Sequence, residues 1–328
     1  MVRRLSILVA VFPLLAAGPS APTPQAAVGQ MVETLVIAQQ LTLVDPGSTP
    51  RVVLRYTPEP GAIVTYETVS RTGLDLSMTL PDGSPMALPL GELLPEVVTT
   101  TRNTVGPRGA DGQVVVRTEQ LGARVTGNVA PEVAAAVRQG LDGATGLVLE
   151  TTVSSDGRPV RIDVVGGRDP GTTALVRQIA EQTLDRLMLF PPEPVGPGAR
   201  WTSDIDLTVS GLALIVSQTV TAKKVTPEAV DLDVVLDVRL GSGGLVVPGL
   251  PPGTPPPKIT RFSGTGGGAT RVDLATLVST GTIAMTIDAD LQTALPGIPG
   301  MALTMKIGQV TETRLAKPAP ELTKPAAR

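Results

Sequence analysis

The chain of 328 residues has no cysteine and no histidine, and only three Phe, two Tyr and one Trp. Without histidine, Ser-His-Asp and Cys-His catalysis and imidazole metal ligands are excluded. Without cysteine, disulfides, thiolate nucleophiles and iron–sulfur clusters are excluded. The scarcity of aromatics, with 27 basic against 30 acidic residues, argues against nucleic-acid binding, which needs a basic surface and often stacking platforms. We therefore predict a non-enzymatic protein with no cofactor and no nucleic-acid partner.

Residues 1–18 have the pattern of a secretory signal peptide. Arg3 and Arg4 precede an apolar run from Leu5 to Ala17, and small residues and prolines follow. The alternative is an uncleaved membrane anchor. A spanning helix needs about 20 apolar residues, whereas this run is shorter and contains Pro13. We predict cleavage after Gly18 and before Ala27, a secreted or periplasmic location in the bacterial cell envelope, and a mature chain that does not span the membrane.

In the rest of the chain hydrophobic residues recur mainly with a period of two, and Val and Thr fill the periodic segments, as half-buried strands favour. This pattern predicts a mainly β (β-dominant α+β) fold with two similar antiparallel β-rich halves and one principal amphipathic helix. The expected parts are a partly disordered lead-in at 19–44, a first β-rich half at 45–170, a connecting helix at 171–189, a second β-rich half at 190–316 and a disordered tail at 317–328. Residues 31–44 fit either strand or helix. The expected strands are 51–56, 62–80, 113–119, 147–153, 158–165, 204–220, 229–240, 259–263, 269–274, 277–291 and 302–315.

Helical periodicity is restricted to two segments. Thr172 is a suitable cap for a helix reaching about Leu189, with an apolar side that includes Leu175, Ile179 and Leu187. This helix either packs on a sheet or forms a mobile lid over an apolar cavity. A second helix is expected from Pro131 to Leu141, because proline favours a first turn and glycine follows at 143.

Two passages indicate an internal duplication. Pro60-Gly61-Ala62 and Pro197-Gly198-Ala199 each open a long strand pattern that contains a Gly-Leu-x-Leu step. The alternative is a chance likeness between strands that follow Pro-Gly turns. We predict the duplication, with the two halves packed together.

The passage from Phe190 to Trp201 reads F-P-P-E-P-V-G-P-G-A-R-W, and Gly264–Gly266 with Arg271–Leu274 leads into a later long strand. Together they resemble a family of uncharacterised secreted bacterial β-rich proteins that share a P-x-x-P-V-x-x-G-x-x-W passage. The resemblance implies an envelope or secreted location and β-rich halves over about 50–316. It implies no catalytic residue.

Gly264–Ala269 reads G-T-G-G-G-A and matches the dinucleotide fingerprint in form. That fingerprint requires a following helix, whose N-terminus holds the pyrophosphate. Here the β pattern continues through Arg271, so we predict a glycine-rich loop or bulge instead. No S-x-x-K or G-x-S-x-G motif supplies a nucleophile.

Carboxylates recur two residues apart, a spacing that places both on one face of a strand. Such pairs form a solvated strand face, a calcium site or a glycosidase pair. No calcium-loop motif occurs, and one Trp and two Tyr are few for a sugar site. We predict the solvated face and no metal site. The pairs are Asp204 with Asp206, Asp231 with Asp233, and Asp288 with Asp290.

In several expected strands apolar residues do not alternate with polar ones, as in Gly211–Val216. Methionines near the C-terminus add apolar surface that adapts to irregular shapes. A twisted sheet around a helix can leave an apolar cavity. We therefore predict binding of a lipid or another apolar small molecule, with Trp201 as either a ligand contact or a structural plug. The alternative function is a structural or protein-interaction module of the envelope, with an envelope protein as partner and an exposed proline-rich loop at 247–258. The candidate ligand contacts are Leu175, Ile179, Leu187, Trp201, Leu214 and Met285.

Overall fold

The computed structural model describes residues 39–79, 83–89, 94–127, 129–166, 188–209, 212–241, 258–295 and 298–316. This part of the chain is dominated by strands and contains one helix, α1 (Pro131–Asp142). The strands are β1 (Gln39–Asp45), β2 (Ile63–Thr79), β3 (Pro85–Pro89), β4 (Glu96–Arg108), β5 (Val114–Thr126), β6 (Val148–Val153), β7 (Pro159–Gly166), β8 (Arg200–Val209), β9 (Leu212–Val225), β10 (Ala229–Leu240), β11 (Lys258–Asp273), β12 (Val278–Leu295) and β13 (Ile298–Leu315).

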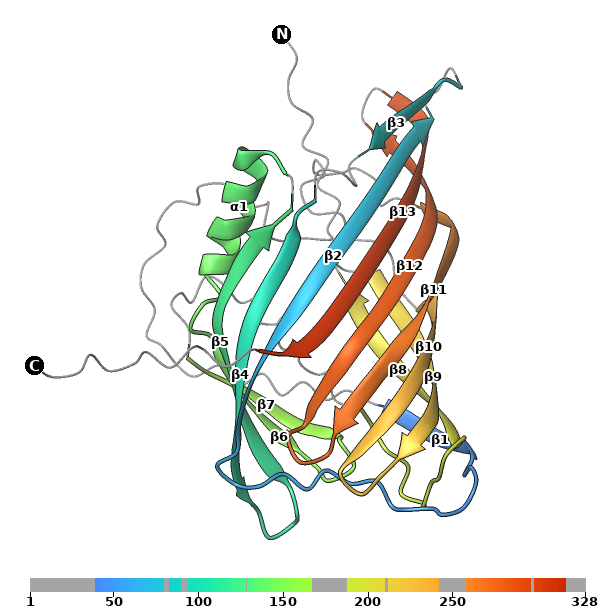
Figure 1. Ribbon diagram of the computed structural model, residues 1–328. Helices are drawn as coiled ribbons and strands as arrows, with labels where there is room; N and C mark the ends of the chain where they lie inside the picture. The colour runs from blue at the N-terminus through green and yellow to red at the C-terminus, as the bar shows by residue number, and fades with distance from the viewer. Residues whose placement is uncertain are drawn as a thin grey trace, which may run out of the picture.

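All the strands belong to one antiparallel sheet with the order β1-β8-β9-β10-β11-β12-β13-β2-β4-β5-β6-β7, and β3 pairs with the far end of β2. Figure 1 shows that this sheet curls strongly, with β2, β13 and β12 on one side and β8, β9 and β10 turned behind them. The curl gives the sheet an inner and an outer face. Its mainly β, antiparallel character confirms the fold class expected from the sequence.

The two expected halves meet in the pairing of β13 with β2, which runs from Ala302–Thr79 to Leu315–Tyr66. They therefore contribute to one continuous sheet. The two Pro-Gly turns have the same hydrogen bonds: Gly61 and Ala62 exchange bonds with Val105, and Gly198 and Ala199 do so with Ala222. Both turn glycines have a positive φ, +83° and +82°. The turns are thus equivalent, while the duplication of the whole halves stays a prediction.

Several expected boundaries differ from the observed elements. The expected strand 204–220 falls on two strands, β8 and β9, and the expected strands 259–263 and 269–274 are parts of the single strand β11. Segment 51–56 forms only an isolated bridge, between Val52 and Val195. Strand β4 was not anticipated, although its sequence is rich in Val and Thr. Residues 39–44 of the ambiguous lead-in belong to β1.

Two local predictions are confirmed. The Asp156-Gly157 turn joins β6 to β7 as an antiparallel hairpin, and Gly157 adopts the positive φ of 90° that glycine permits. Helix α1 begins with Pro131 at its first turn, and Val137 and Leu141 pack on Val97 of β4. The expected helix at 171–189 lies outside the described residues up to 187, and Met188 and Leu189 have no regular secondary structure. The signal segment, residues 242–257 and the tail from 317 also lie outside the described residues.

The glycine run is part of a regular strand, which corrects the expected loop or bulge. Gly264, Gly266 and Gly268 lie on the inner face of β11, opposite Val238, Leu236 and Val234 of β10, without a register shift. A Cβ on Gly268 would lie 1.9 Å from the Thr282 carbonyl oxygen, and one on Gly264 would lie 2.6 Å from the Val238 Cβ. Any other residue type at these positions would push the neighbouring strands apart, so the close approach of the strands favours glycine at β11.

At one end of the curl the interior is closed by a base core. Trp201 is 1% exposed and contacts Phe190, whose ring centroid lies 6.5 Å away, and Phe190 in turn lies 5.1 Å from Tyr56. Strand residues from both halves join this cluster, so the core holds the two sides of the curl together. These residues are Val105, Val114, Val116, Val153, Val220, Ala222, Val230, Leu232, Val272 and Leu274.

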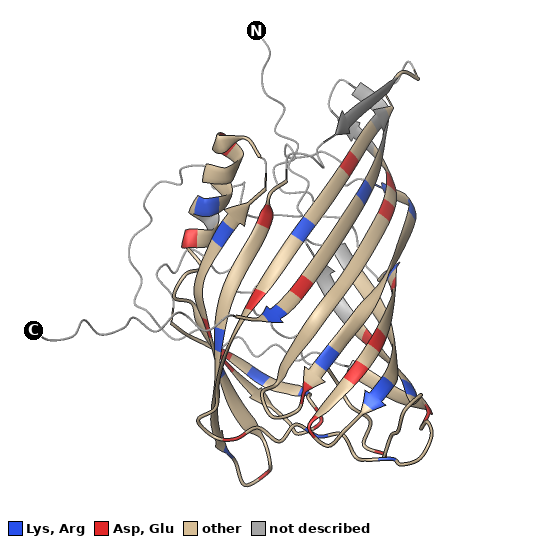
Figure 2. Cartoon of the chain, viewed as in Figure 1, with Lys and Arg blue, Asp and Glu red and all other residues tan. Residues whose placement is uncertain are grey.

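Ion-paired side chains lie along the outer face of the sheet, and Figure 2 shows the charged positions spread over the strands. Glu67 of β2 bonds to Arg124 of β5 at 2.8 Å and to Arg314 of β13 at 2.9 Å. These long side chains surround the outer-facing pair Val69 and Val98, each 2% exposed. Arginine stems can cover apolar surface while their heads stay in water, so the charged residues also shield the sheet where its two halves meet.

Candidate functional site

The inner face of β9–β12 carries an apolar patch, here called the aliphatic wall. Its buried part consists of residues of β9 and β10, and Phe262, Ile283 and Met285 pack against it in a partly buried state. Met188 contacts both the aliphatic wall and the base core. The buried residues of the wall are Leu214, Val216, Val234, Leu236 and Val238.

The glycine row of β11 makes this wall continuous. Gly266 lies between Leu236 of β10 and Met285 of β12 in the register of the sheet, and Gly268 lies between Val234 and Ile283. Because the glycines have no side chain, the aliphatic side chains of β10 and β12 close over β11 and pack together. On the β12 side of the wall, Ile283 and Met285 remain partly exposed.

The inner face of β2, β4, β5 and β6 has a different chemistry. Its central positions are buried but polar and uncharged: Thr68, Thr101, Asn103, Thr118 and Thr151. Register confirms that they share one face, because Asn103 lies opposite Thr118 and Thr151 lies opposite Val116. The curled sheet therefore has an aliphatic side and a polar, uncharged side.

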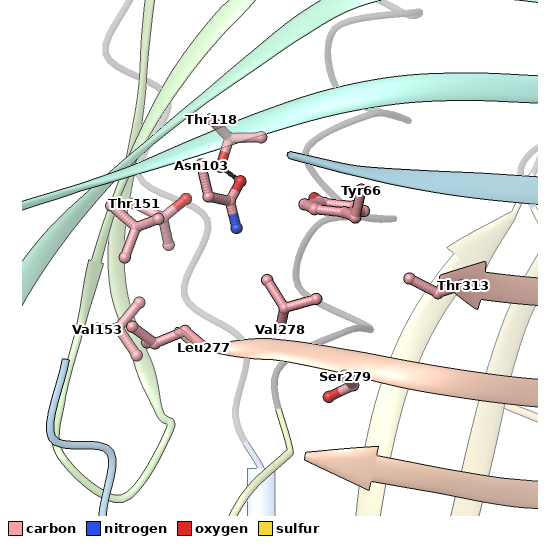
Figure 3. Close-up of a pocket in the computed structure, with 10 residues that line it drawn as sticks. Tyr66, Asn103, Thr118, Thr151, Val153, Leu277, Val278, Ser279 and Thr313 are labelled. Atoms are coloured by element: carbon pink, nitrogen blue, oxygen red, sulfur yellow. Dashed lines mark hydrogen bonds between the residues drawn. The ribbon is translucent and has the colours of Figure 1, made fainter. Parts of the chain in front are cut away.

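A cavity of about 30 Å³, here called the polar cavity after the Thr, Ser, Asn and Tyr side chains among its lining residues, lies between this polar side and the start of β12 (Figure 3). The Thr118 hydroxyl donates to Asn103 Oδ1 at 3.1 Å, and the Asn103 amide nitrogen points into the cavity. The Thr151 hydroxyl also points inward and has no hydrogen-bond partner in the described structure. The lining residues are Tyr66, Asn103, Val116, Thr118, Thr151, Val153, Leu277, Val278, Ser279 and Thr313.

A second, open hollow of about 160 Å³ lies where β10 ends and β11 begins. It includes two arginines, but Arg239 pairs with Asp237 at 3.2 Å and Arg261 pairs with Asp290 at 2.7 Å. Both cations are therefore neutralised locally, and the hollow offers no excess charge to an anion.

The paired carboxylates whose side chains the structure describes lie on the outer face, as the sequence predicted for a solvated strand face; they are Asp204, Asp231, Asp233, Asp288 and Asp290. Asp231 bonds to Arg271 at 2.8 Å and Asp233 to Lys223 at 2.7 Å. Arg261 and the Thr304 hydroxyl hold the pKa of Asp290 below its usual range by hydrogen bonding to the carboxylate. Within the described ranges no three acidic side chains come together as a metal-ion site would require.

Other groups also have shifted pKa values because of hydrogen bonding or burial. Hydrogen bonds from Arg124 and Arg314 lower the pKa of Glu67, and Thr126 and Arg71 lower that of Glu96. Burial raises the pKa of Tyr56, whose hydroxyl lies 3.2 Å from both the backbone nitrogen and the carbonyl oxygen of Met188. These groups belong to the outer ion pairs and to the base core.

The structure brings together two of the six candidate ligand contacts. Leu214 and Met285 both belong to the aliphatic wall. Trp201 lies in the base core, where the structural-plug alternative places it. Leu175, Ile179 and Leu187 lie outside the described residues.

Sequence reasoning missed the polar cavity. The available signal was the cluster of Thr and Asn at alternating positions of β4, Thr99-x-Thr101-x-Asn103. None of the described helical residues forms a stretch long and apolar enough to cross a membrane.

Comparison with models of protein families finds no match for this chain, and comparison with curated protein sequences finds none either. The resemblance to secreted β-rich proteins through the Trp201 passage therefore stays a prediction.

Proposed function

We propose that this chain is a non-enzymatic protein of the bacterial cell envelope, secreted or periplasmic, that binds a lipid or another apolar ligand along its aliphatic wall. The supporting observation is that Ile283 and Met285 pack on a buried cluster yet remain partly exposed on the inner face. Covering apolar surface is favourable by about 25 cal/mol per Å². Methionine also adapts to ligands of irregular shape.

The expected secretory segment at 1–18 is consistent with such a role, because an apolar molecule needs a carrier to cross an aqueous compartment. The ion pairs cover the outer face, where they favour contact with water. The inner face is thus suited to an apolar ligand, and the outer face is suited to contact with water.

The direct test is mass spectrometry of the protein purified from its native envelope, under native and then denaturing conditions. An added mass that disappears on denaturation and is identified by extraction as a lipid would support the proposal. A bare polypeptide mass, with no lipid taken up from added vesicles, would contradict it.

A matched pair of variants locates the site. Met285→Gln places a polar amide on the aliphatic wall, whereas Ala284→Gln places the same amide on the exposed outer face of the same strand. We expect Met285→Gln to reduce the amount of bound ligand and Ala284→Gln to leave it unchanged. Circular dichroism of both variants verifies that the fold is retained.

The second candidate function is an interaction module of the envelope. Its supporting observation is strand β7 at one end of the sheet path, where Val160 and Val165 are 42% and 45% exposed. A strand edge with exposed apolar side chains can pair with a strand of another protein. A photoreactive amino acid in place of Val160 would test this function in the native envelope. A cross-linked product with an envelope protein, combined with a bare polypeptide mass, would favour this function over ligand binding.

A further inference from the structure

The polar cavity contains a buried hydroxyl that the protein itself leaves without a hydrogen bond. Thr151 is 2% exposed, and its Oγ1 has no partner in the described structure. Figure 3 shows this oxygen directed into the cavity, toward which the Asn103 amide nitrogen also points. An unsatisfied buried hydroxyl destabilises a protein, so its presence in a cavity indicates a group that is completed from outside the chain.

The lining determines the chemistry of that group. The Thr151 hydroxyl and the Asn103 amide both can donate, so they favour an occupant with an acceptor oxygen. None of the ten described residues around the cavity is charged. A carboxylate or phosphate would be desolvated there without a counter-ion, at a large cost in free energy. The occupant is therefore polar and neutral.

The cavity and the aliphatic wall both include residues of β12. Ser279 lines the cavity, and Ile283 and Met285 belong to the wall. The three residues have the same strand parity and lie on one face. Ile283 lies four residue steps along the strand from Ser279, which corresponds to about 13 Å. One elongated molecule can thus reach both regions.

The cavity volume of about 30 Å³ limits what enters it. Sites for drug-sized ligands have about 300–1,000 Å³. Only a small group, such as a hydroxyl or an ester carbonyl, fits in the cavity, while a hydrocarbon chain extends along the wall.

We propose that the polar cavity holds the neutral hydroxyl or ester end of the ligand, so that the ligand class is an uncharged amphipath such as a monoacylglycerol. This inference rests on the proposed function, because it assumes that a ligand binds to the aliphatic wall. Thr151 and Asn103 are then specificity-determining residues that select a neutral polar end over a charged one.

The test compares two ligands with the same chain, 1-monooleoylglycerol and oleate, titrated at pH 8 in detergent-free buffer and followed by native mass spectrometry. We expect the wild-type protein to bind 1-monooleoylglycerol more tightly than oleate. Thr151→Val keeps the side-chain shape and removes the hydroxyl. It should weaken 1-monooleoylglycerol binding about tenfold and leave oleate binding unchanged.

The matched control is Thr152→Val, the same substitution at the next residue of β6, which faces outward opposite Arg161. It should bind both ligands as the wild type does. In the ligand-free protein, Thr151→Val should raise Tm by about 2–4 °C because it removes an unsatisfied hydroxyl.

The outcomes separate two kinds of failure. If the wild type binds neither ligand and takes up no lipid from added vesicles, both the proposed function and the headgroup site are wrong. If it binds neither ligand but takes up another lipid from vesicles, only the headgroup site is wrong. If it binds 1-monooleoylglycerol but Thr151→Val binds it equally well, or if oleate binds more tightly, ligand binding stands and the headgroup site is wrong. A lower Tm for ligand-free Thr151→Val would show that the hydroxyl is satisfied by internal water, which would also overturn the inference.

Discussion

The curvature of the sheet at β11 yields a quantitative prediction for Gly268. A Cβ built on this residue lies 1.9 Å from the Thr282 carbonyl oxygen and 2.9 Å from the Ile283 Cα, which are both backbone atoms. Ordinary contact requires about 3.4 Å or more, so β11 and β12 must separate by about 1.5 Å to admit a methyl group. Neither contacting atom belongs to a flexible side chain that could rotate away.

The expected cost of Gly268→Ala follows from that displacement. A hydrogen bond lengthened by about 1.5 Å is effectively broken, and each lost ladder bond costs about 1 kcal/mol. Overpacking of a tight interior adds about 1–3 kcal/mol. We therefore expect a loss of about 3 kcal/mol in the free energy of unfolding, with a fall in Tm of about 6–12 °C.

Gly308→Ala is the matched control. Gly308 lies in the middle of β13, and a Cβ built there meets nothing within 4 Å. The same substitution should stabilise the protein by about 0.4–1 kcal/mol, because alanine restricts the unfolded chain. Urea denaturation followed by the fluorescence of Trp201, the single tryptophan, measures both variants. Equal stability of Gly268→Ala and Gly308→Ala would refute the argument that close strand approach favours glycine at β11.

Three further perturbations test the core and the outer face. Trp201→Ala should lower the free energy of unfolding by about 3–5 kcal/mol, because the side chain is buried in the base core. Circular dichroism during urea denaturation measures this loss, and a loss below about 1 kcal/mol would contradict that placement. Tyr56→Phe should cost about 1–3 kcal/mol, because the hydroxyl bonds to the backbone of Met188, and an unchanged denaturation midpoint would argue against that bond. Glu67 has a lowered pKa when folded, so its ion pairs stabilise the protein above its unfolded pKa of about 4.3, and this contribution disappears as pH falls through the lower folded pKa. Glu67→Gln should therefore destabilise by about 1 kcal/mol or less at pH 7 and by less at pH 3, and an equal effect at both pH values would contradict the assignment.

Local patterns in the sequence predicted those features that depend on local interactions. The Asp156-Gly157 hairpin forms because glycine adopts a positive φ at the turn, and α1 begins at Pro131 because a first-turn proline loses no helical hydrogen bond. Asp231 and Asp233, spaced two apart, share the solvated face of β10, where they meet cations of neighbouring strands. Each of these features is decided within a few residues.

Features that depend on distant contacts were predicted poorly. The run Gly264–Gly268 resembles a loop when read locally, yet it forms the centre of a strand, because β10 and β12 pair with it on both sides. The long pattern at 204–220 also looked continuous, although it contains two strands that pair with each other. Period-two alternation gives the face of each residue but not its partner strand.

The sequence by itself determined that the chain is mainly β, that charge lies on one face of its strands and that histidine and cysteine chemistry are excluded. Only the tertiary structure decided that β13 pairs with β2, which joins the two halves in one sheet. It also decided that Asn103, Thr151 and Ser279, from three strands far apart in the chain, line one cavity. The physical reason is that alternation and turn geometry act over a few residues, whereas sheet order and curvature are set by the packing of side chains from the whole chain.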